Sequence, residues 1–353
     1  MRLDRDTSPE ADGPHVLVRT EGRAGFLTLN RPRALNALTH PMVLRIDEAL
    51  TAWEDDPAVE TVVVQGAGER GLCAGGDIRA IYEDARAGGT ETLDFWRDEY
   101  RLNARIARFP KPYVAFMDGI VMGGGVGVSA HGSVRVVTER SRVAMPETGI
   151  GFVPDVGGTY LLSRAPGELG THLALTGGQA GAADALLTGL ADHFVPSEEL
   201  PHLAEELTRA PAHEALARFE RPAPPGRLAA ARDWIDAAYA ADTVEEIVDR
   251  LLDSGVPEAK ETATTLLTRS PTALKVTLLA LRRARLLDSL EAVLDMEFRL
   301  SHSALTSADL VEGIRAQVID KDRDPHWTPP TLAEVTEADV ARYFAERDLP
   351  KTR

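Results

Sequence analysis

The chain has 353 residues, of which 44% are hydrophobic and 27% are charged, and its formal net charge is −16. This composition excludes a disordered chain, because the apolar surface is large enough to offset the entropy lost on folding. The acidity argues against a nucleic-acid backbone as the main partner, since no basic field is left to release counterions. It does not exclude a small anionic ligand held by a few local arginine or lysine side chains.

The first fourteen residues are rich in charged and turn-forming residues and contain no apolar segment. They predict a disordered tail at 1–14 and neither a signal peptide nor a transit peptide. No eighteen consecutive residues are apolar, so we expect no membrane-spanning helix and no membrane partner. Together with a single cysteine, Cys73, which cannot form a disulfide framework, these features predict a cytoplasmic protein.

Apolar periodicity predicts alternating strands and helices over the first half of the chain. In chain order these are a β-hairpin over 15–29, a helix over 39–54 with Thr39 as its N-cap, a buried strand over 58–66, helices over 78–86 and 92–108, a strand with a glycine loop over 112–125, and a strand over 133–139. This order is typical of α/β architecture with a largely parallel sheet.

After about residue 200 the chain becomes rich in Ala, Leu, Arg and Glu with helical periodicity. No strand pattern stands out over 202–317, and the segment PAPPG at 222–226 is typical of a joint between helices. We therefore expect an α/β core over 15–200 and a helical region over 201–353 that packs on the core.

Two glycine loops each follow a predicted strand: Ala74-Gly75-Gly76-Asp77 and Met122-Gly123-Gly124-Gly125. Backbone without a Cβ can approach a ligand closely, so one N–H group from each loop could form an oxyanion hole for a thioester carbonyl. The alternative is that both loops are tight turns used only for packing. A dinucleotide fingerprint at Gly125-x-Gly127-x-x-Ala130 is disfavoured, because the next predicted strand begins too soon for a crossover helix.

The segment MPETGIGFVPDVGGTYLL (145–162) carries two carboxylates, Glu147 and Asp155, among apolar residues and glycines. A buried charge is costly unless it is paired, solvated or functional. If two carboxylates face one pocket, their pKa values are pushed apart, so that one can act as an acid and the other as a base. The alternative is a pair of exposed loop acids. Glu99 lies near the apolar stripe of the helix predicted over 92–108, where a solvated side chain is the usual interpretation.

Two further residues have reactive side chains. Cys73 lies beside the first glycine loop and His131 follows the second. For both, a packing role is the simpler interpretation. No cluster of His, Asp, Glu or Cys has metal-ligand spacing, so we expect no metal.

Four motifs occur in order along the chain: LNRPRALNAL (29–38), GLCAGGDI (71–78), KPYVAFMDGIVMGGGVGVS (111–129) and MPETGIGFVPDVGGTYLL (145–162). Their order and spacing resemble the crotonase (enoyl-CoA hydratase/isomerase) superfamily. The resemblance implies a spiral of ββα repeats followed by helices, usually assembled into trimers or hexamers. A homo-oligomer is compatible with this chain, although its C-terminal helices could cover the surface through which hydratases trimerise.

Within the superfamily the chain most closely resembles the branch that hydrolyses 3-hydroxyisobutyryl-CoA. Hydratases usually carry a glycine where this chain has Asp155, and a second catalytic glutamate where it has Gly127. The segment FWRDEYRLN supplies an acid at Glu99, and the stretch 296–327 also matches that branch. Thioester hydrolysis needs an activated nucleophile and an oxyanion site, and the CoA thiolate is a good leaving group. The residue set therefore fits hydrolysis better than hydration.

Family roles carry over to this chain as expectations. The backbone N–H groups of Gly76 and Gly124 form the oxyanion hole. Glu147 is the principal catalytic carboxylate, either as a general base on water or as a nucleophile that forms an acyl anhydride. Asp155 orients the water or the substrate hydroxyl, and Glu99 lines the acyl pocket.

The resemblance also implies where coenzyme A lies. The residues expected to hold it are Arg31, Arg33, Ala34, Ala74, Gly76, Asp77 and Ile78. The two arginines are candidate phosphate ligands, and Lys321 could also reach a phosphate, although a solvated lysine is the simpler interpretation. Coenzyme A is part of the substrate, so no separate cofactor is expected.

The residue set predicts thioester hydrolysis, and the resemblance implies that the substrate is a short β-hydroxyacyl-CoA, namely 3-hydroxyisobutyryl-CoA from valine breakdown. One alternative is an enoyl-CoA hydratase or isomerase on the same fold. The other is a catalytically silent subunit of an assembly.

Overall fold

The structure is a computed structural model that describes residues 13–346, so the predicted tail over 1–14 lies almost entirely outside the described residues. Within 13–346, nine strands form two sheets, with the orders β1-β2-β3-β5-β7-β9 and β4-β6-β8. Their bounds are β1 Val16–Glu21, β2 Ala24–Leu29, β3 Thr61–Gly66, β4 Gly71–Cys73, β5 Tyr113–Met117, β6 Ile120–Met122, β7 Val134–Val137, β8 Arg142–Ala144 and β9 His193–Phe194.

Helices and loops make up the rest of the described chain. Those before β9 are α1 His40–Glu54, α2 Ile78–Ala87, α3 Glu91–Arg108, α4 Gly124–Gly127, α5 Gly158–Ser163, α6 Leu169–Thr176 and α7 Ala182–Leu187, with the 3-10 helices η1 Pro32–Ala34 and η2 Glu147–Ile150. Those after β9 are η3 Ser197–Glu199, α8 Leu200–Leu207, α9 Ala212–Phe219, α10 Leu228–Tyr239, α11 Val244–Asp253, α12 Pro257–Leu266, α13 Pro271–Ala284, α14 Leu290–Leu305, α15 Ala308–Ile314, the π-helix η4 Arg315–Ile319, η5 Leu332–Glu334 and α16 Glu337–Tyr343.

The larger sheet is covered on both faces. β1 and β2 form the predicted antiparallel hairpin, and β2, β3, β5, β7 and β9 pair in parallel. In β3, Val62 and Val64 belong to the main core with α1 and α3, whereas Val63 belongs to a second cluster with α8 and α9. Successive strand residues point to opposite faces, so a continuous run of valines is buried on both sides of a parallel sheet.

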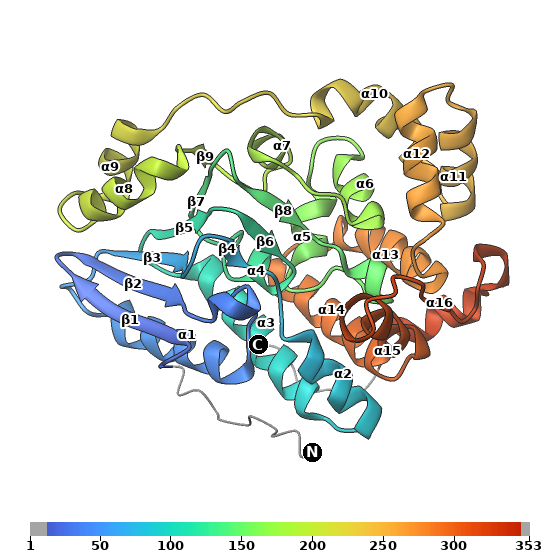
Figure 1. Cartoon of the computed structure of the whole chain (residues 1–353), viewed down its shortest axis with the longest axis horizontal. Helices are drawn as coiled ribbons and strands as arrows, with labels where there is room; N and C mark the ends of the chain where they lie inside the picture. Colours follow the sequence, from blue (N-terminus) through green and yellow to red (C-terminus); the bar gives the residue numbers. More distant parts are fainter. Residues whose placement is uncertain (1–12, 347–353) are drawn as a thin grey trace, which may run out of the picture.

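Each pass of the chain through the core adds one strand to each sheet. β3 is followed by β4, β5 by β6, and β7 by β8, which builds the two sheets from successive repeats (Figure 1). This is the spiral arrangement that the resemblance implies. The sequence pattern assigns no strand to β4, β8 or β9, because segments of two or three residues are too short to show a period of two.

The helices after β9 pack directly on the core. α13 packs on α5, α14 on α3 and α5, and α15 on α2 (Figure 1). α15 also packs on η2. The contact between α15 and η2 is so close that a Cβ built on Gly313 would lie 2.3 Å from the carbonyl carbon of Ile150. Within the described residues, no strand follows β9 and no helix is long and apolar enough to cross a membrane. The division into regions at residue 200 stays a prediction.

Candidate active site

A cavity of about 280 Å³ lies where the two glycine loops meet α3, η2 and α15. The predicted site residues that line it are Ala74, Gly76, Ile78, Glu99, Gly124, Glu147 and Asp155. The other predicted residues, Arg31, Arg33, Ala34 and Asp77, are not part of its lining. The structure therefore brings the proposed catalytic groups together and leaves part of the predicted coenzyme A set outside.

Both glycine loops have backbone conformations that glycine adopts readily and other residues do not. Gly75 has a φ of 114° after β4, and Gly123 has a φ of 49° after β6. A Cβ built on Gly124 would lie 3.3 Å from the amide nitrogen of Gly76, so the two loops meet. Among residues 13–346, neither the Gly76 amide nor the Gly124 amide donates to a protein acceptor. These two N–H groups are therefore free to bind a ligand in the cavity.

Helix α3 carries Glu99 one turn after Phe95, and both side chains line the cavity. Glu99 is only 2% exposed, so the solvated side chain that is usual for a helical glutamate is wrong here. Within the described chain its Oε1 has no hydrogen-bond partner, and it lies 2.6 Å from the position of a Cβ built on Gly124. Burial, reinforced by the charge of Asp155, raises the pKa of Glu99 well above its ordinary value.

Glu147 and Asp155 reach the cavity from the loop after β8. Both are buried. Burial raises the pKa of Asp155 to about 7, against the opposing effect of a hydrogen bond from Tyr100. Burial and then the charge of Asp155 raise the pKa of Glu147 well above its ordinary value. Burial thus favours the protonated form of each carboxyl, and the charge of Asp155 opposes ionisation of Glu99 and Glu147, an arrangement suited to acid/base chemistry.

The position where hydratases carry a second glutamate is closed in this chain. A Cβ built on Gly127 would lie 2.8 Å from the Cβ of Val156 and 2.9 Å from Nδ2 of Asn103. A protein interior is packed as closely as an organic crystal, so a side chain at this position would have to displace its neighbours.

Arg31, one of the predicted phosphate ligands, is engaged within the protein. Its Nη2 lies 3.0 Å from Oδ2 of Asp77, and its Nη1 donates to the carbonyl oxygen of Ala37 at 2.7 Å. Arg33 and Ala34 are exposed on η1 beside it. A phosphate that binds Arg31 would have to share the guanidinium with Asp77.

Sequence reasoning missed two polar residues of the C-terminal half that line the cavity, Arg269 and Gln317. Arg269 donates through Nε and Nη2 to the carbonyl oxygen of Thr176, at 3.1 and 2.7 Å, and burial lowers its pKa. Gln317 lies on the π-helix η4, a type of helix that is frequent at functional sites. Neither residue stands in a motif, so only the folded chain shows that they reach the cavity.

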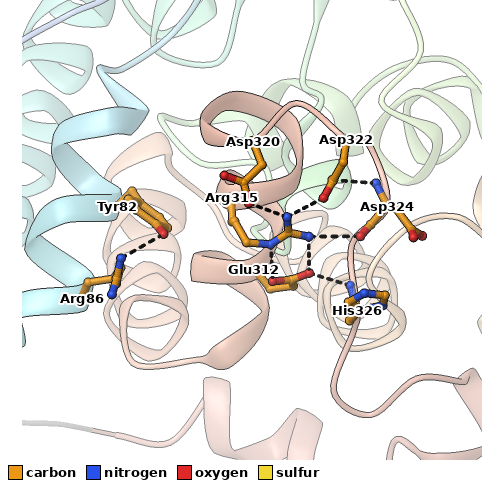
Figure 2. A network of polar contacts seen from close by, with 8 residues as sticks. All are labelled: Tyr82, Arg86, Glu312, Arg315, Asp320, Asp322, Asp324 and His326. Carbon is orange, nitrogen blue, oxygen red and sulfur yellow. Dashed lines mark hydrogen bonds and ion pairs between the residues drawn. The ribbon is translucent and has the colours of Figure 1, made fainter.

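A network centred on Arg315 holds the π-helix (Figure 2). Arg315 donates to both carboxylate oxygens of Glu312, at 2.9 Å each. It also donates to Asp320 at 2.7 Å and to Asp322 at 2.6 Å (Figure 2). Because these contacts join both ends of η4, they fix the wall of the cavity that carries Gln317.

Cys73 and His131 pack in the interior, as predicted. Cys73 is fully buried behind the first glycine loop, and burial raises the pKa of its thiol to about 12. The Nε2 of His131 lies 2.7 Å from the carbonyl oxygen of Val156, and burial lowers the pKa of His131 to about 4. Neither side chain lines the cavity.

Residues 24–344 match the family model described as enoyl-CoA hydratase/isomerase. The chain therefore belongs to the enoyl-CoA hydratase/isomerase family. It is 44% identical to a protein of Rattus norvegicus named 3-hydroxyisobutyryl-CoA hydrolase, mitochondrial, over 97% of this chain and 92% of that protein. The Homo sapiens protein of the same name is 43% identical, over 98% of this chain and 91% of that protein.

Two solved structures are also similar over nearly their whole length. One, described as a carnitinyl-CoA dehydratase from Mycobacterium thermoresistibile, is 55% identical with a TM-score of 0.94, and the match covers 97% of this chain and 99% of that chain. The other, described as an enoyl-CoA hydratase from Rhodobacter sphaeroides, is 46% identical with a TM-score of 0.89, covering 94% and 97%. Both support the crotonase fold for this chain.

The names of the relatives correct one prediction. The expectation of a cytoplasmic protein is wrong, because the curated relatives from rat and human are named as mitochondrial proteins. Cell location depends on short targeting segments, and neither composition nor the fold of the core reports it.

Proposed function

We propose that this chain hydrolyses the thioester of 3-hydroxyisobutyryl-CoA to 3-hydroxyisobutyrate and free coenzyme A. The curated relatives are named for this activity, and they match nearly the whole chain. The observation that carries the proposal is the closed position at Gly127, beside a cavity that holds buried carboxyls and two free amides. Such a site can activate a nucleophile and stabilise the oxyanion during attack on a thioester, but it lacks the second glutamate that hydration uses.

The oxyanion hole consists of the amides of Gly76 and Gly124, which donate to the thioester oxygen. Their hydrogen bonds strengthen as the carbonyl oxygen gains negative charge in the tetrahedral intermediate. In one route Glu147 takes a proton from water, and the water oxygen attacks the carbonyl carbon. In the other route a carboxylate oxygen of Glu147 attacks the carbonyl carbon itself and forms an acyl anhydride, which water then hydrolyses. In both routes a C–O bond forms, the C–S bond breaks, and coenzyme A leaves as a thiolate.

Asp155 and Glu99 recognise the acyl group in this proposal. Asp155 orients the attacking water or the β-hydroxyl of the substrate. Glu99 faces the acyl chain, and its unpartnered Oε1 matches a hydroxyl that needs a hydrogen-bond partner. The stacked rings of Trp96 and Phe152, with centroids 5.2 Å apart, offer an apolar wall to the methyl branch.

Coenzyme A is bound, in this proposal, at the mouth of the cavity and along the first glycine loop. The proposed contacts are Arg31, Arg33, Ala34, Ala74, Gly76, Asp77 and Ile78. Lys321 is exposed, with a φ of 60°, and remains a candidate for a phosphate contact. Coenzyme A enters as part of the substrate, and the proposed reaction needs no other cofactor. The reaction belongs to valine breakdown, and a homo-oligomer is compatible with it.

The alternatives fit the cavity less well. Hydration or dehydration, the activities named for the two solved structures, would use a second carboxylate at the position of Gly127, where Val156 and Asn103 leave no room. A catalytically silent subunit would have no use for the unpartnered buried oxygens of Glu99 and Glu147, which cost stability in an empty site.

Release of free coenzyme A, followed with a thiol reagent, tests the proposal. The chain should release thiol from 3-hydroxyisobutyryl-CoA in catalytic amounts and should leave crotonyl-CoA unhydrated. Hydration of crotonyl-CoA without any thiol release would contradict the proposal. Failure to bind coenzyme A in calorimetry would favour the silent subunit.

A further inference from the structure

The turn that follows Asp155 has a conformation that needs support. Val156 has a φ of 52°, which is rare for a β-branched residue, and Gly157 follows with a φ of 79°. Such a backbone persists only where the surrounding structure holds it. The position of the Asp155 carboxyl depends directly on this turn.

Glu297, from helix α14, binds this turn from 140 residues further along the chain. Its side chain is fully buried. Oε2 accepts a hydrogen bond from the amide of Gly157 at 2.6 Å. Oε1 accepts hydrogen bonds from both the amide and the hydroxyl of Thr159, at 2.9 and 2.5 Å. Three donors on one buried carboxyl form a clamp that fixes the two residues on either side of Gly158.

Tyr100, from helix α3, holds the carboxyl of Asp155 itself. Its hydroxyl donates to Oδ2 of Asp155 at 2.7 Å and lies 2.7 Å from Oγ of Ser301. Because the phenol has one proton, Ser301 must be the donor in the second bond. Ser301 lies one turn after Glu297 on α14, so the same helix supports both the turn and the tyrosine.

We propose that Glu297 and Tyr100 are positioning residues for Asp155, through which the C-terminal helix α14 completes the active site. The inference rests on the proposed function, because it assigns the clamp to the same hydrolytic reaction. Neither residue lines the cavity, so each acts through Asp155 and not on the substrate. Helix α14 then supports the catalytic carboxyl through two of its side chains, Glu297 and Ser301.

The ionisable groups around Asp155 determine what each variant should do. Tyr100 and Glu99 face it from α3, Glu147 from η2 and Glu297 from α14. His131 contacts the turn through the carbonyl of Val156 but stays neutral, because burial lowers its pKa to about 4. Of these contacts, the Tyr100 hydrogen bond is the one that lowers the pKa of Asp155.

Tyr100→Phe removes one hydroxyl and keeps the ring. The acidic limb of kcat/KM for 3-hydroxyisobutyryl-CoA should then move up by about one pH unit, because the ionised form of Asp155 loses a charge-assisted hydrogen bond. Turnover at pH 6.5 should fall about tenfold and recover as the pH rises, with KM nearly unchanged. A role in stability alone would lower the melting temperature without moving the acidic limb.

Glu297→Gln keeps one acceptor for Thr159 but turns an amide group toward the N–H of Gly157. We expect kcat to fall about tenfold with little change in KM. Ser303→Ala is the matched control, because Ser303 lies on the same helix and its hydroxyl has no hydrogen-bond partner among the described residues; this variant should keep full activity.

An unmoved acidic limb in Tyr100→Phe overturns the inference, whether or not Glu297→Gln folds. Equal losses in Glu297→Gln and Ser303→Ala also overturn it, because the effect would then belong to the helix in general. If the wild-type chain releases no thiol, the proposed function fails first, and the inference falls with it.

Discussion

Gly127 faces Val156 so closely that a Cβ on Gly127 would lie 2.8 Å from the Cβ of Val156. The residue that hydratases use as their second catalytic glutamate could not be accommodated here by one substitution. Val156 also belongs to the turn that follows Asp155. The contact between Gly127 and Val156 therefore joins the position that lacks the hydratase glutamate to the turn that carries Asp155. The chemistry of this cavity is thus tied to the packing behind it.

Gly127→Glu should destabilise the protein without creating a hydratase. Overpacking a filled interior costs about 1–3 kcal/mol, and an unpaired buried carboxyl adds to this cost. Urea unfolding measures the loss, and Gly13→Glu is the control, because a Cβ at Gly13 meets nothing within 4 Å. A stable Gly127→Glu variant that hydrates crotonyl-CoA would show that the position is open.

Glu147→Gln should lower the rate of thiol release by at least about 100-fold, the usual contribution of a general acid or base. The amide is close in size, so binding of coenzyme A, measured by calorimetry, should persist. A variant that binds coenzyme A and still turns over at the wild-type rate would remove Glu147 from the mechanism.

Asp155→Asn should stabilise the protein while it lowers activity. Burial raises the pKa of Asp155 from 3.8 to about 7 in the folded state, so its protonated form is favoured there. The contribution of protonated Asp155 to the free energy of unfolding is therefore fully present below about pH 4 and is lost as the pH rises through 7. Asparagine does not ionise, so at pH 8 the variant should gain up to about 4 kcal/mol over the wild type.

Urea unfolding at several pH values tests this sign. The advantage of Asp155→Asn should shrink steadily between pH 8 and pH 4. An advantage that is constant across this range would mean that ionisation of Asp155 is not its source.

Cys73→Ala should keep thioesterase turnover and lose about 1–2 kcal/mol of stability, the cost of a small cavity in the core. The thiol is fully buried, and its pKa is raised to about 12. Iodoacetamide at pH 8 should therefore modify the urea-unfolded chain but not the folded one. Rapid alkylation of the folded protein with loss of activity would restore Cys73 as a candidate nucleophile.

Much of the core could be predicted from the sequence, because its elements are long enough to show their period. The hairpin, α1, α3 and the valine-rich β3 all lie where periodicity indicates. The short strands β4, β8 and β9 could not be predicted, because pairing with their neighbours defines them and local pattern does not.

The candidate site divides in the same way. Glu147, Asp155 and the glycine loops stand in motifs, and the structure brings them to one cavity. Arg269 and Gln317 reach it only through tertiary packing. Glu297 is also recognisable in the sequence, because it lies between Met296 and Phe298 at a core position of its helix, where a lone carboxylate is as costly as in the Glu147 segment.

Product analysis in isotopically labelled water tests the central claim most directly. The wild-type chain would be incubated with 3-hydroxyisobutyryl-CoA for many turnovers, and the products would be identified by mass spectrometry. Hydrolysis predicts free coenzyme A and 3-hydroxyisobutyrate with the label in its carboxylate. Conversion to the α,β-unsaturated methacrylyl-CoA, with no free coenzyme A, would mean that the enzyme removes water from its substrate and would contradict the account.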